Sequence, residues 1–211
     1  MATVLGALLY TICRLYIDDI LIWGESNEAL IENVEKVLQK LQAHNIFLNP
    51  NKFFMGMTSI EYTGHVLDAE GLSFTPEKLE KVFQVPLPVY DSEMKAFLGL
   101  AQYFHDHVKG LASIAAPLHE LIHQYDKRKR RRIEYTPKAI EAFEEIKRAI
   151  NECPKLHFID PKLPIVLATD ASDIACGAYL YQLDEEGRQI PITFLSHKFS
   201  EQEKRWHTPD K

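Results

Sequence analysis

The chain has 211 residues, of which 46% are hydrophobic and 26% charged, a composition typical of one large globular domain or two small ones. Its formal net charge of −6 excludes bulk electrostatic attraction to a polyanion, so any contact with nucleic acid has to come from local basic patches.

The first predicted element is a β-hairpin. Apolar residues dominate positions 4–15 and 20–24, and the residues between them are Tyr-Ile-Asp-Asp. Both runs are typical of buried strands, so we expect Asp18 and Asp19 at the tip of the hairpin. The first run lacks a basic start and a clear cleavage site, and Arg14 interrupts it. We therefore interpret it neither as a signal peptide nor as a membrane span.

The two adjacent carboxylates indicate a metal site. Carboxylates side by side repel each other beside a hydrophobic core unless a cation compensates. Mg²⁺ takes oxygen ligands and is commonly held by one or two carboxylates together with substrate phosphates. Asp18 and Asp19 are therefore candidate ligands of Mg²⁺ or Mn²⁺. The alternative is a backbone role alone, because Asp is a favoured turn residue.

A helix and more strands are predicted next. Residues 26–44 have an apolar stripe at helical spacing, with Ser26 as the N-cap. Residues 46–55 contain an Asn-Pro turn between two short apolar runs, which predicts a pair of short strands. Residues 60–67 and 71–74 are predicted to form a hairpin.

A helical unit is predicted over residues 75–123. Thr75 and the proline after it are typical of a helix start, and this helix is expected to end before Pro86. A further helix is predicted over residues 91–110, and another over residues 112–123.

An unbroken basic run follows the helical unit. It consists of Lys127, Arg128, Lys129, Arg130, Arg131 and Arg132. Such a run is the local footprint of phosphate binding, and a solvated loop is the alternative. A further helix is expected from Thr136-Pro137 to about Cys153.

The last part of the chain is predicted to be a sheet. Strands are expected at residues 164–170, 178–182 and 190–196, and a helical turn at 200–206. The first of these strands ends in Asp170.

The cysteines indicate an intracellular protein. Cys13, Cys153 and Cys176 lie far apart in apolar surroundings, without a Cys-x-x-Cys spacing. We interpret them as buried, reduced thiols.

Several segments are similar, in order and spacing, to the polymerase of gypsy-type LTR retrotransposons. Residues 9–22 resemble the last metal motif of the reverse transcriptase palm. The other similar segments are residues 48–54 (a later palm motif), 62–67 (the primer grip), 97–104 with 115–118 (the thumb), 142–147 with 153–154 (the linking segment) and 169–172 (the first ribonuclease H strand).

This resemblance implies an RNA-directed DNA polymerase with an attached ribonuclease H. Asp18 and Asp19 would be catalytic metal ligands, and the ions would polarise the primer 3′ hydroxyl and the nucleotide phosphates. Asp170 would be a catalytic metal ligand of the ribonuclease H.

Three more residues gain roles from the resemblance. Tyr16 would support the primer-end nucleotide, with a core tyrosine as the alternative. Lys52 would contact the leaving pyrophosphate, with a surface lysine at a turn as the alternative. Gly64 lies in the segment that resembles the primer grip.

The element order and the resemblance together predict an α+β chain in four parts. These are the C-terminal part of a palm (1–74), a thumb-like helical unit (75–123), a basic linker with a connecting helix (124–152) and an incomplete ribonuclease-H-like sheet (153–211). The expected partners are an RNA/DNA primer-template, deoxynucleoside triphosphates and the remaining parts of the Pol polyprotein, without a membrane. The expected location is a cytoplasmic particle or the nucleus, without secretion.

The chain also departs from the family pattern. The palm's third aspartate and the fingers have no counterpart here, so Met1 corresponds to an internal methionine. The next ribonuclease H acid would fall beyond Lys211. Ala175 replaces a glycine of the Asp-Ala-Ser-x-x-Gly-x-Gly pattern, and His105 stands where the thumb often has a basic residue. The alternative function is therefore a catalytically inactive retroelement relic that at most binds nucleic acid.

Overall fold

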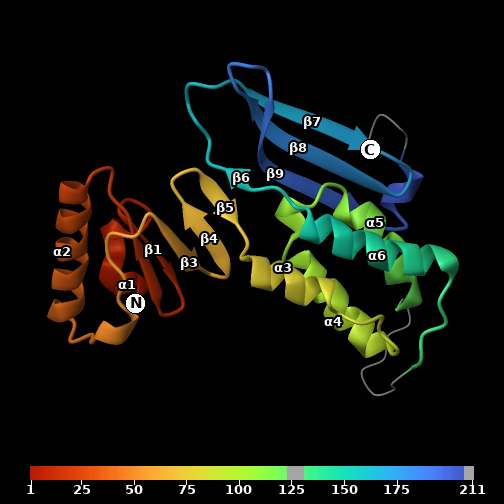
Figure 1. The fold of residues 1–211 in the computed structure, drawn as a ribbon, viewed down its shortest axis with the longest axis horizontal. Coiled ribbons are helices and arrows are strands. Elements are labelled where there is room, and N and C mark those ends of the chain that lie inside the picture. The colour runs from red at the N-terminus through yellow and green to blue at the C-terminus, as the bar shows by residue number, and fades with distance from the viewer. Residues whose placement is uncertain (123–130, 207–211) are drawn as a thin grey trace. The chain divides into compact units, whose positions relative to one another are not determined.

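The computed structural model describes residues 1–122 and 131–206, and the chain forms two compact units, Met1–Ala69 and Glu70–Lys211 (Figure 1). No helix in these described stretches is long and apolar enough to cross a membrane.

The first unit begins with helical turns, which corrects the prediction of a long first strand. Helix α1 (Ala2–Leu5) runs into the 3₁₀ turn η1 (Gly6–Leu8), and only then does strand β1 (Cys13–Tyr16) pair with β2 (Asp19–Ile22). Two residues with positive φ, Gly6 (50°) and Tyr10 (66°), bend the chain between α1 and β1. A continuous strand cannot include such bends, because its residues all have negative φ.

Helix α2 (Asn27–Ala43) confirms the predicted helix and its cap. The Ser26 hydroxyl accepts a hydrogen bond from the Ala29 amide at 3.1 Å. The inner face of α2 is buried together with α1 and β1. The buried residues of this core are Leu5, Cys13, Val37 and Leu41.

The remainder of the first unit differs from the prediction. Residues 46–55 form the 3₁₀ turn η2 (Pro50–Lys52) instead of two strands, because Asn49 accepts a hydrogen bond from the Asn51 amide and so makes an Asx turn. Residues 60–67 are not one strand but most of a hairpin of their own, made of β3 (Ser59–Tyr62) and β4 (His65–Asp68).

The second unit brings together two segments far apart in sequence. Strand β5 (Gly71–Ser73) pairs antiparallel with β6 (Leu156–His157). A Cβ atom at Gly71 would lie 1.9 Å from the Leu156 carbonyl oxygen, so only glycine allows this approach.

Along the described sequence, four α-helices come between β5 and β6. They are α3 (Pro76–Phe83), α4 (Asp91–Gln102), α5 (Leu111–Leu121) and α6 (Pro137–Asn151). Thr75 and Thr136 cap α3 and α6 as the sequence indicates. The helix predicted over 91–110 ends at Gln102, because the chain tightens into the 3₁₀ turn η3 (His105–His107) before α5.

The helices share one core with α6. Phe143 of α6 is fully buried and packs on Phe97 of α4, with 4.5 Å between the ring centroids. Lys147 of α6 donates a hydrogen bond to the Val85 carbonyl at 3.1 Å, just beyond α3. Helix α6 is therefore an integral part of the helical core, although the division of the chain into domains at the residues given above stays a prediction.

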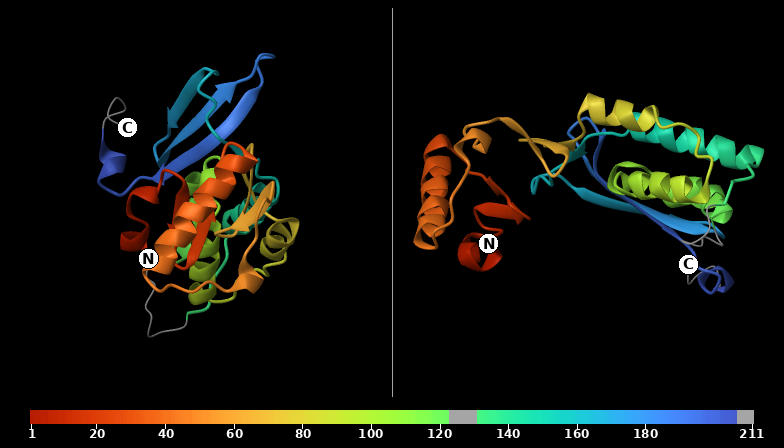
Figure 2. Two further views of the ribbon diagram at one scale, coloured as in Figure 1. Left: turned by 90° about the vertical axis from the view of Figure 1, so that its left-hand side faces the viewer. Right: turned by 90° about the horizontal axis from the view of Figure 1, so that it is seen from below.

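The three predicted C-terminal strands are present. β7 (Ile165–Ala171), β8 (Ala175–Leu183) and β9 (Gln189–Lys198) form an antiparallel sheet in that order, followed by the 3₁₀ turn η4 (Glu203–Arg205). Helix α5 and η3 pack on β9, and Figure 2 shows the sheet beside the helices. Phe194 stacks on Tyr179 at 4.6 Å between ring centroids.

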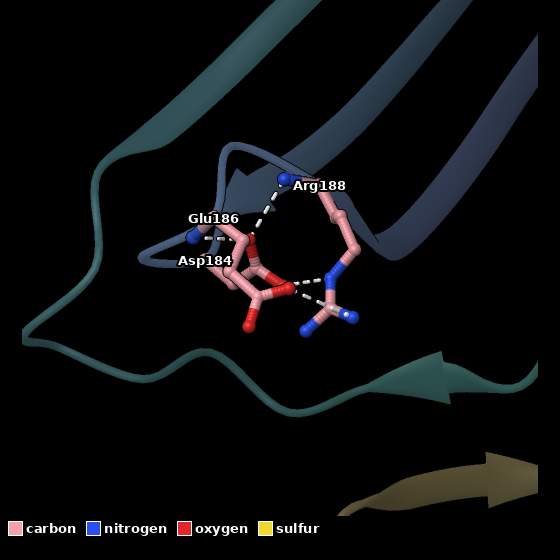
Figure 3. Close-up of polar contacts among 3 residues, drawn as sticks. All are labelled: Asp184, Glu186 and Arg188. Atoms are coloured by element: carbon pink, nitrogen blue, oxygen red, sulfur yellow. Dashed lines mark hydrogen bonds and ion pairs between the residues drawn. The ribbon is translucent and has the colours of Figure 1, made fainter.

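The turn between β8 and β9 is fixed by Asp184. Its carboxylate accepts hydrogen bonds from the Glu186 amide at 2.9 Å and from the Arg188 amide and Nε, each at 2.7 Å (Figure 3). The bond from the Arg188 side chain is the main cause that holds the pKa of Asp184 below its ordinary value. Gly187 supplies the positive φ, 77°, that closes the turn.

Candidate functional site

The predicted hairpin is present, with its tip one residue earlier than expected. Tyr16 lies opposite Asp19, so Ile17 and Asp18 form the two-residue turn and Asp19 is the first residue of β2. All four residues are exposed. The sequence therefore placed Asp18 correctly and missed that Ile17 is the other turn residue.

Ile17 is in a strained conformation. Its φ is 55°, in the left-handed region, and its side chain is 74% exposed. Two-residue hairpin turns need positive φ and normally use Gly, Asn or Asp, whereas a β-branched residue there is an outlier. The cost is about 1–2 kcal/mol, and such strain concentrates at functional sites. No pattern in the sequence reveals this strain, since it depends on the pairing register.

The two carboxylates at the hairpin are available for a ligand. The side-chain carboxylates of Asp18 and Asp19 accept no hydrogen bond from, and form no ion pair with, another residue in the described ranges. Exposed carboxylates are suitable oxygen ligands for Mg²⁺ or Mn²⁺. Across the described residues, however, no group of three His, Cys, Asp or Glu side chains could hold a metal ion. The hairpin supplies two carboxylates of a metal site and not a complete set.

A second hairpin lies beside the first within the same unit. Its turn consists of Thr63 (φ 54°) and Gly64 (φ 78°), between β3 and β4. Burial raises the pKa of Tyr62, and the nearby Asp19 carboxylate raises it further. The structure thus brings Asp19 close to the residue that precedes the Thr63-Gly64 turn, a proximity that the sequence did not predict.

The other predicted residues of this unit have mixed outcomes. Tyr16 is 53% exposed, so the alternative of a core tyrosine is wrong. Lys52 is exposed at the end of η2, and no hydrogen bond or ion pair within the described residues connects it to Asp18 or Asp19. Its role in nucleotide binding stays a prediction.

Asp170 lies in the second unit. It is exposed near the end of β7, opposite Gly177 of β8. Ala175, which replaces the glycine of the family pattern, is buried at the start of β8. The catalytic role of Asp170 stays a prediction, since the described residues contain no three-residue metal cluster there.

Most of the predicted basic run lies outside the described residues. Lys127, Arg128, Lys129 and Arg130 belong to the part of the chain that is not described. Arg131 is fixed by its backbone, because its carbonyl accepts a hydrogen bond from the Asp91 amide at 3.0 Å and its amide donates one to the Asp91 carboxylate at 3.3 Å.

The outer face of α4 is a feature that sequence reasoning missed. Gly99 lies towards the C-terminal end of the helix and is exposed, and a Cβ atom there would meet nothing within 4 Å. Glycine inside a helix costs about 1 kcal/mol relative to alanine, and no contact within the described part of the chain requires it at this position. Lys95 and Tyr103 are exposed one turn before and after it. The sequence signal that could have revealed this face is the glycine within a predicted helix.

Comparisons with known proteins assign the two ends of the chain to families. Residues 1–67 match the family described as reverse transcriptase (RNA-dependent DNA polymerase). Residues 135–211 match the RNase H-like domain found in reverse transcriptase.

Curated relatives match the chain along its whole length. The Tf2-3 transposon polyprotein of Schizosaccharomyces pombe is 30% identical over 209 residues, which are 99% of this chain and 15% of the relative. The retrovirus-related Pol polyprotein from transposon 297 of Drosophila melanogaster is 31% identical over 211 residues, which are 100% of this chain and 19% of the relative. The chain thus spans less than a fifth of the length of these polyproteins.

Solved structures confirm the fold. The foamy viral protease-reverse transcriptase in complex with double-stranded DNA matches 100% of this chain and 36% of its own, with a TM-score of 0.80 and 23% identity. The complex of that protein with an RNA/DNA hybrid matches 97% of this chain and 27% of its own, with a TM-score of 0.77 and 24% identity. The predicted fold class, a partial reverse transcriptase followed by a ribonuclease-H-like sheet, is confirmed.

Proposed function

We propose that this chain is part of the RNA-directed DNA polymerase of a gypsy-type LTR retrotransposon, with a ribonuclease H attached. The matched families and the retrotransposon polyproteins support this function. Its partners are an RNA/DNA primer-template, deoxynucleoside triphosphates and other parts of the Pol polyprotein. Its location is intracellular, in a cytoplasmic particle or the nucleus.

The observation that carries the proposal is the hairpin of residues 16–19. It presents two carboxylates, Asp18 and Asp19, to solvent without a partner among the described residues, at a turn that Ile17 holds in a strained conformation. Strain is retained where function requires the geometry. These carboxylates would hold Mg²⁺ or Mn²⁺, which would supply charge stabilisation for phosphoryl transfer.

The neighbouring residues have positioning roles. Tyr16 is exposed beside the turn and offers an aromatic surface to the primer-end nucleotide. Tyr62, the residue before the Thr63-Gly64 turn, interacts electrostatically with Asp19, and the turn can contact the primer strand closely because Gly64 has no side chain. Lys52 contacts the leaving pyrophosphate, and Asp170 is a metal ligand of the ribonuclease H.

A direct test is the binding of Mn²⁺ to the 211-residue chain, followed by nuclear magnetic resonance. Mn²⁺ should broaden the amide signals of residues 16–20 first, and Mg²⁺ should reverse the effect. The double variant Asp18→Asn, Asp19→Asn should lose the broadening. The matched control is Glu144→Gln, Glu145→Gln, which removes two adjacent exposed carboxylates from α6. Equal broadening in the Asp18, Asp19 variant would refute the metal site.

The outer face of α4 is proposed to contact the nucleic acid duplex. Gly99 lets a duplex backbone approach the helix closely, and Lys95 is placed for phosphate contact. Gly99→Ala should weaken binding to primer-template and should also stabilise the helix. The affinity for primer-template should therefore fall while the free energy of unfolding rises. The basic run 127–132 should add to the salt dependence, by about 0.9 in slope for each DNA phosphate neutralised.

A second candidate function is that of a catalytically inactive relic that at most binds nucleic acid. It is favoured by the lack of a three-residue metal cluster in the described residues. Primer extension on an RNA template with Mg²⁺ or Mn²⁺ is the test that can exclude this second function. We expect no extension by the 211-residue chain, because two carboxylates hold the metal poorly. Extension that Asp18→Asn abolishes would exclude the relic.

A further inference from the structure

A cavity of about 290 Å³ is lined entirely by residues of the second unit. Its walls come from α4, η3, α5 and β9. Part of the wall is apolar, and the polar part is formed by Gln102, His105, His119, Ser196, His197 and Lys198. The functional roles described above use none of these residues.

The polar wall has more hydrogen-bond donors than acceptors. Lys198 Nζ has one partner in the described structure, the Ala116 carbonyl at a long 3.5 Å, and an ammonium group carries three protons. The Ser196 hydroxyl accepts a hydrogen bond from the Ala112 amide at 3.0 Å, and its own proton remains to be donated. The His119 ring has no hydrogen bond to another described residue.

Among the side chains that line the cavity, Lys198 carries the positive charge. His105 is paired with Asp106 at 2.9 Å and His197 with Glu203 at 3.2 Å. Lys198 forms no ion pair with a described residue, and the Glu201 carboxylate that interacts electrostatically with it is itself paired with Lys204. The N-terminal residues of α5, Leu111 and Ala112, line the same cavity and add the positive end of a helix dipole.

The electrostatics of His119 favour a bound anion. Burial of its ring lowers the pKa of His119, and the nearby Lys198 ammonium lowers it further. A proton on this ring would place a second positive charge near Lys198. An anion beside both groups would offset this repulsion and raise the pKa of His119 again.

We propose that this cavity binds a phosphate group, with Lys198, Ser196 and His119 as its donors. Phosphate suits the site because it carries more negative charge and more acceptor oxygens than a carboxylate, and ammonium groups and helix N-termini are common phosphate donors. The group is either free phosphate or a backbone phosphate of nucleic acid. The proposal does not rest on polymerase activity.

The test is a titration of the 211-residue chain with inorganic phosphate, at constant ionic strength set with chloride. The readout is the histidine Cε1–H signals in nuclear magnetic resonance. We expect a saturable shift of the His119 signal and a rise in the pKa of His119. Lys198→Met should raise the Kd about tenfold, as expected for the loss of one charge-assisted hydrogen bond. Lys198→Arg, which keeps the charge, should restore most of the affinity.

The matched control is Lys204→Met, because Lys204 is paired with Glu201 and does not line the cavity. It should leave the Kd unchanged. The urea midpoint of each variant, measured in parallel, separates a loss of binding from a loss of folding, and His119→Gln provides a second variant in the cavity wall. An identical Kd for Lys198→Met and Lys204→Met, or an absence of saturation in the wild type, would overturn the proposal.

A competition experiment identifies the source of the phosphate. If a DNA duplex displaces inorganic phosphate from the wild-type chain, the site takes a backbone phosphate. If phosphate remains bound in the presence of duplex, the site takes the free ion. Either outcome supports the cavity as a phosphate site.

Discussion

The contact between β5 and β6 gives a sharp prediction for Gly71→Ala. The new Cβ would lie 1.9 Å from the Leu156 carbonyl oxygen and 2.8 Å from the His157 Cα atom, and both of these are backbone atoms. No side-chain rotation relieves this overlap, so the strands have to separate until the Cβ–oxygen distance rises from 1.9 Å to at least 3.0 Å, a shift of 1.1 Å. The φ of Gly71 is not in the left-handed region, so the effect is purely steric.

The expected loss of stability follows from what the separation breaks. About two backbone hydrogen bonds at about 1 kcal/mol each are lost. Leu156, which is 5% exposed, becomes partly hydrated at a further cost of about 1–2 kcal/mol. We therefore expect Gly71→Ala to lower the free energy of unfolding of the second unit by about 3–4 kcal/mol.

The assay is urea unfolding followed by circular dichroism, with Gly99→Ala as the matched control. Gly99→Ala puts a methyl group into open space towards the C-terminal end of α4, so it should stabilise the protein by about 1 kcal/mol. The two variants thus make the same chemical change with opposite expected signs. A Gly71→Ala protein that unfolds within about 0.5 kcal/mol of the wild type would refute the close approach of the strands.

Three more predictions test other parts of the structure. Phe143→Ala should destabilise the second unit by about 3–5 kcal/mol in urea unfolding, because the ring is fully buried, whereas Phe47→Ala, at a 91% exposed ring, should have almost no effect. Tyr135 donates a hydrogen bond to the Pro88 carbonyl, and burial raises its pKa to about 12. Its contribution to stability should be complete below about pH 10 and lost as the pH rises towards 12, and Tyr135→Phe should remove this alkaline loss in urea midpoints measured against pH. Asp184 has a pKa below its ordinary 3.8, so its contribution should be present above that value and lost as the pH falls through the lowered pKa; an unchanged acid profile in Asp184→Asn would contradict this.

Local signals in the sequence were sufficient for most helices and for the C-terminal strands. Ser26 was predicted as an N-cap and Thr75 and Thr136 as helix starts, and all three cap their helices, because an N-cap depends on a few neighbouring residues. The three last strands were predicted for the same reason, since turn residues separate them.

Features that depend on non-local contacts or on a positive φ at an unusual residue were not predictable. The first strand was predicted to be too long, because nothing in the sequence marks the positive φ of Tyr10. The Thr63-Gly64 hairpin was missed because a single glycine within an apolar run is a weak signal. At the candidate site, the exposure of Asp18 and Asp19 followed from their pattern. The strain at Ile17 and the proximity of Asp19 to Tyr62 depend on pairing register and on packing.

The hydrogen bond from the Ala112 amide to Ser196 has a mechanical consequence. It caps the start of α5 with a side chain from β9, 84 residues later in the chain, because the N-cap residue Gly110 has no side chain to do so. A sliding of the sheet by about 1 Å along α5 would break this bond and leave the helix uncapped, at a cost of about 1 kcal/mol. This bond therefore ties the start of α5 to β9, so we expect the helix and the strand to shift together in displacements smaller than this.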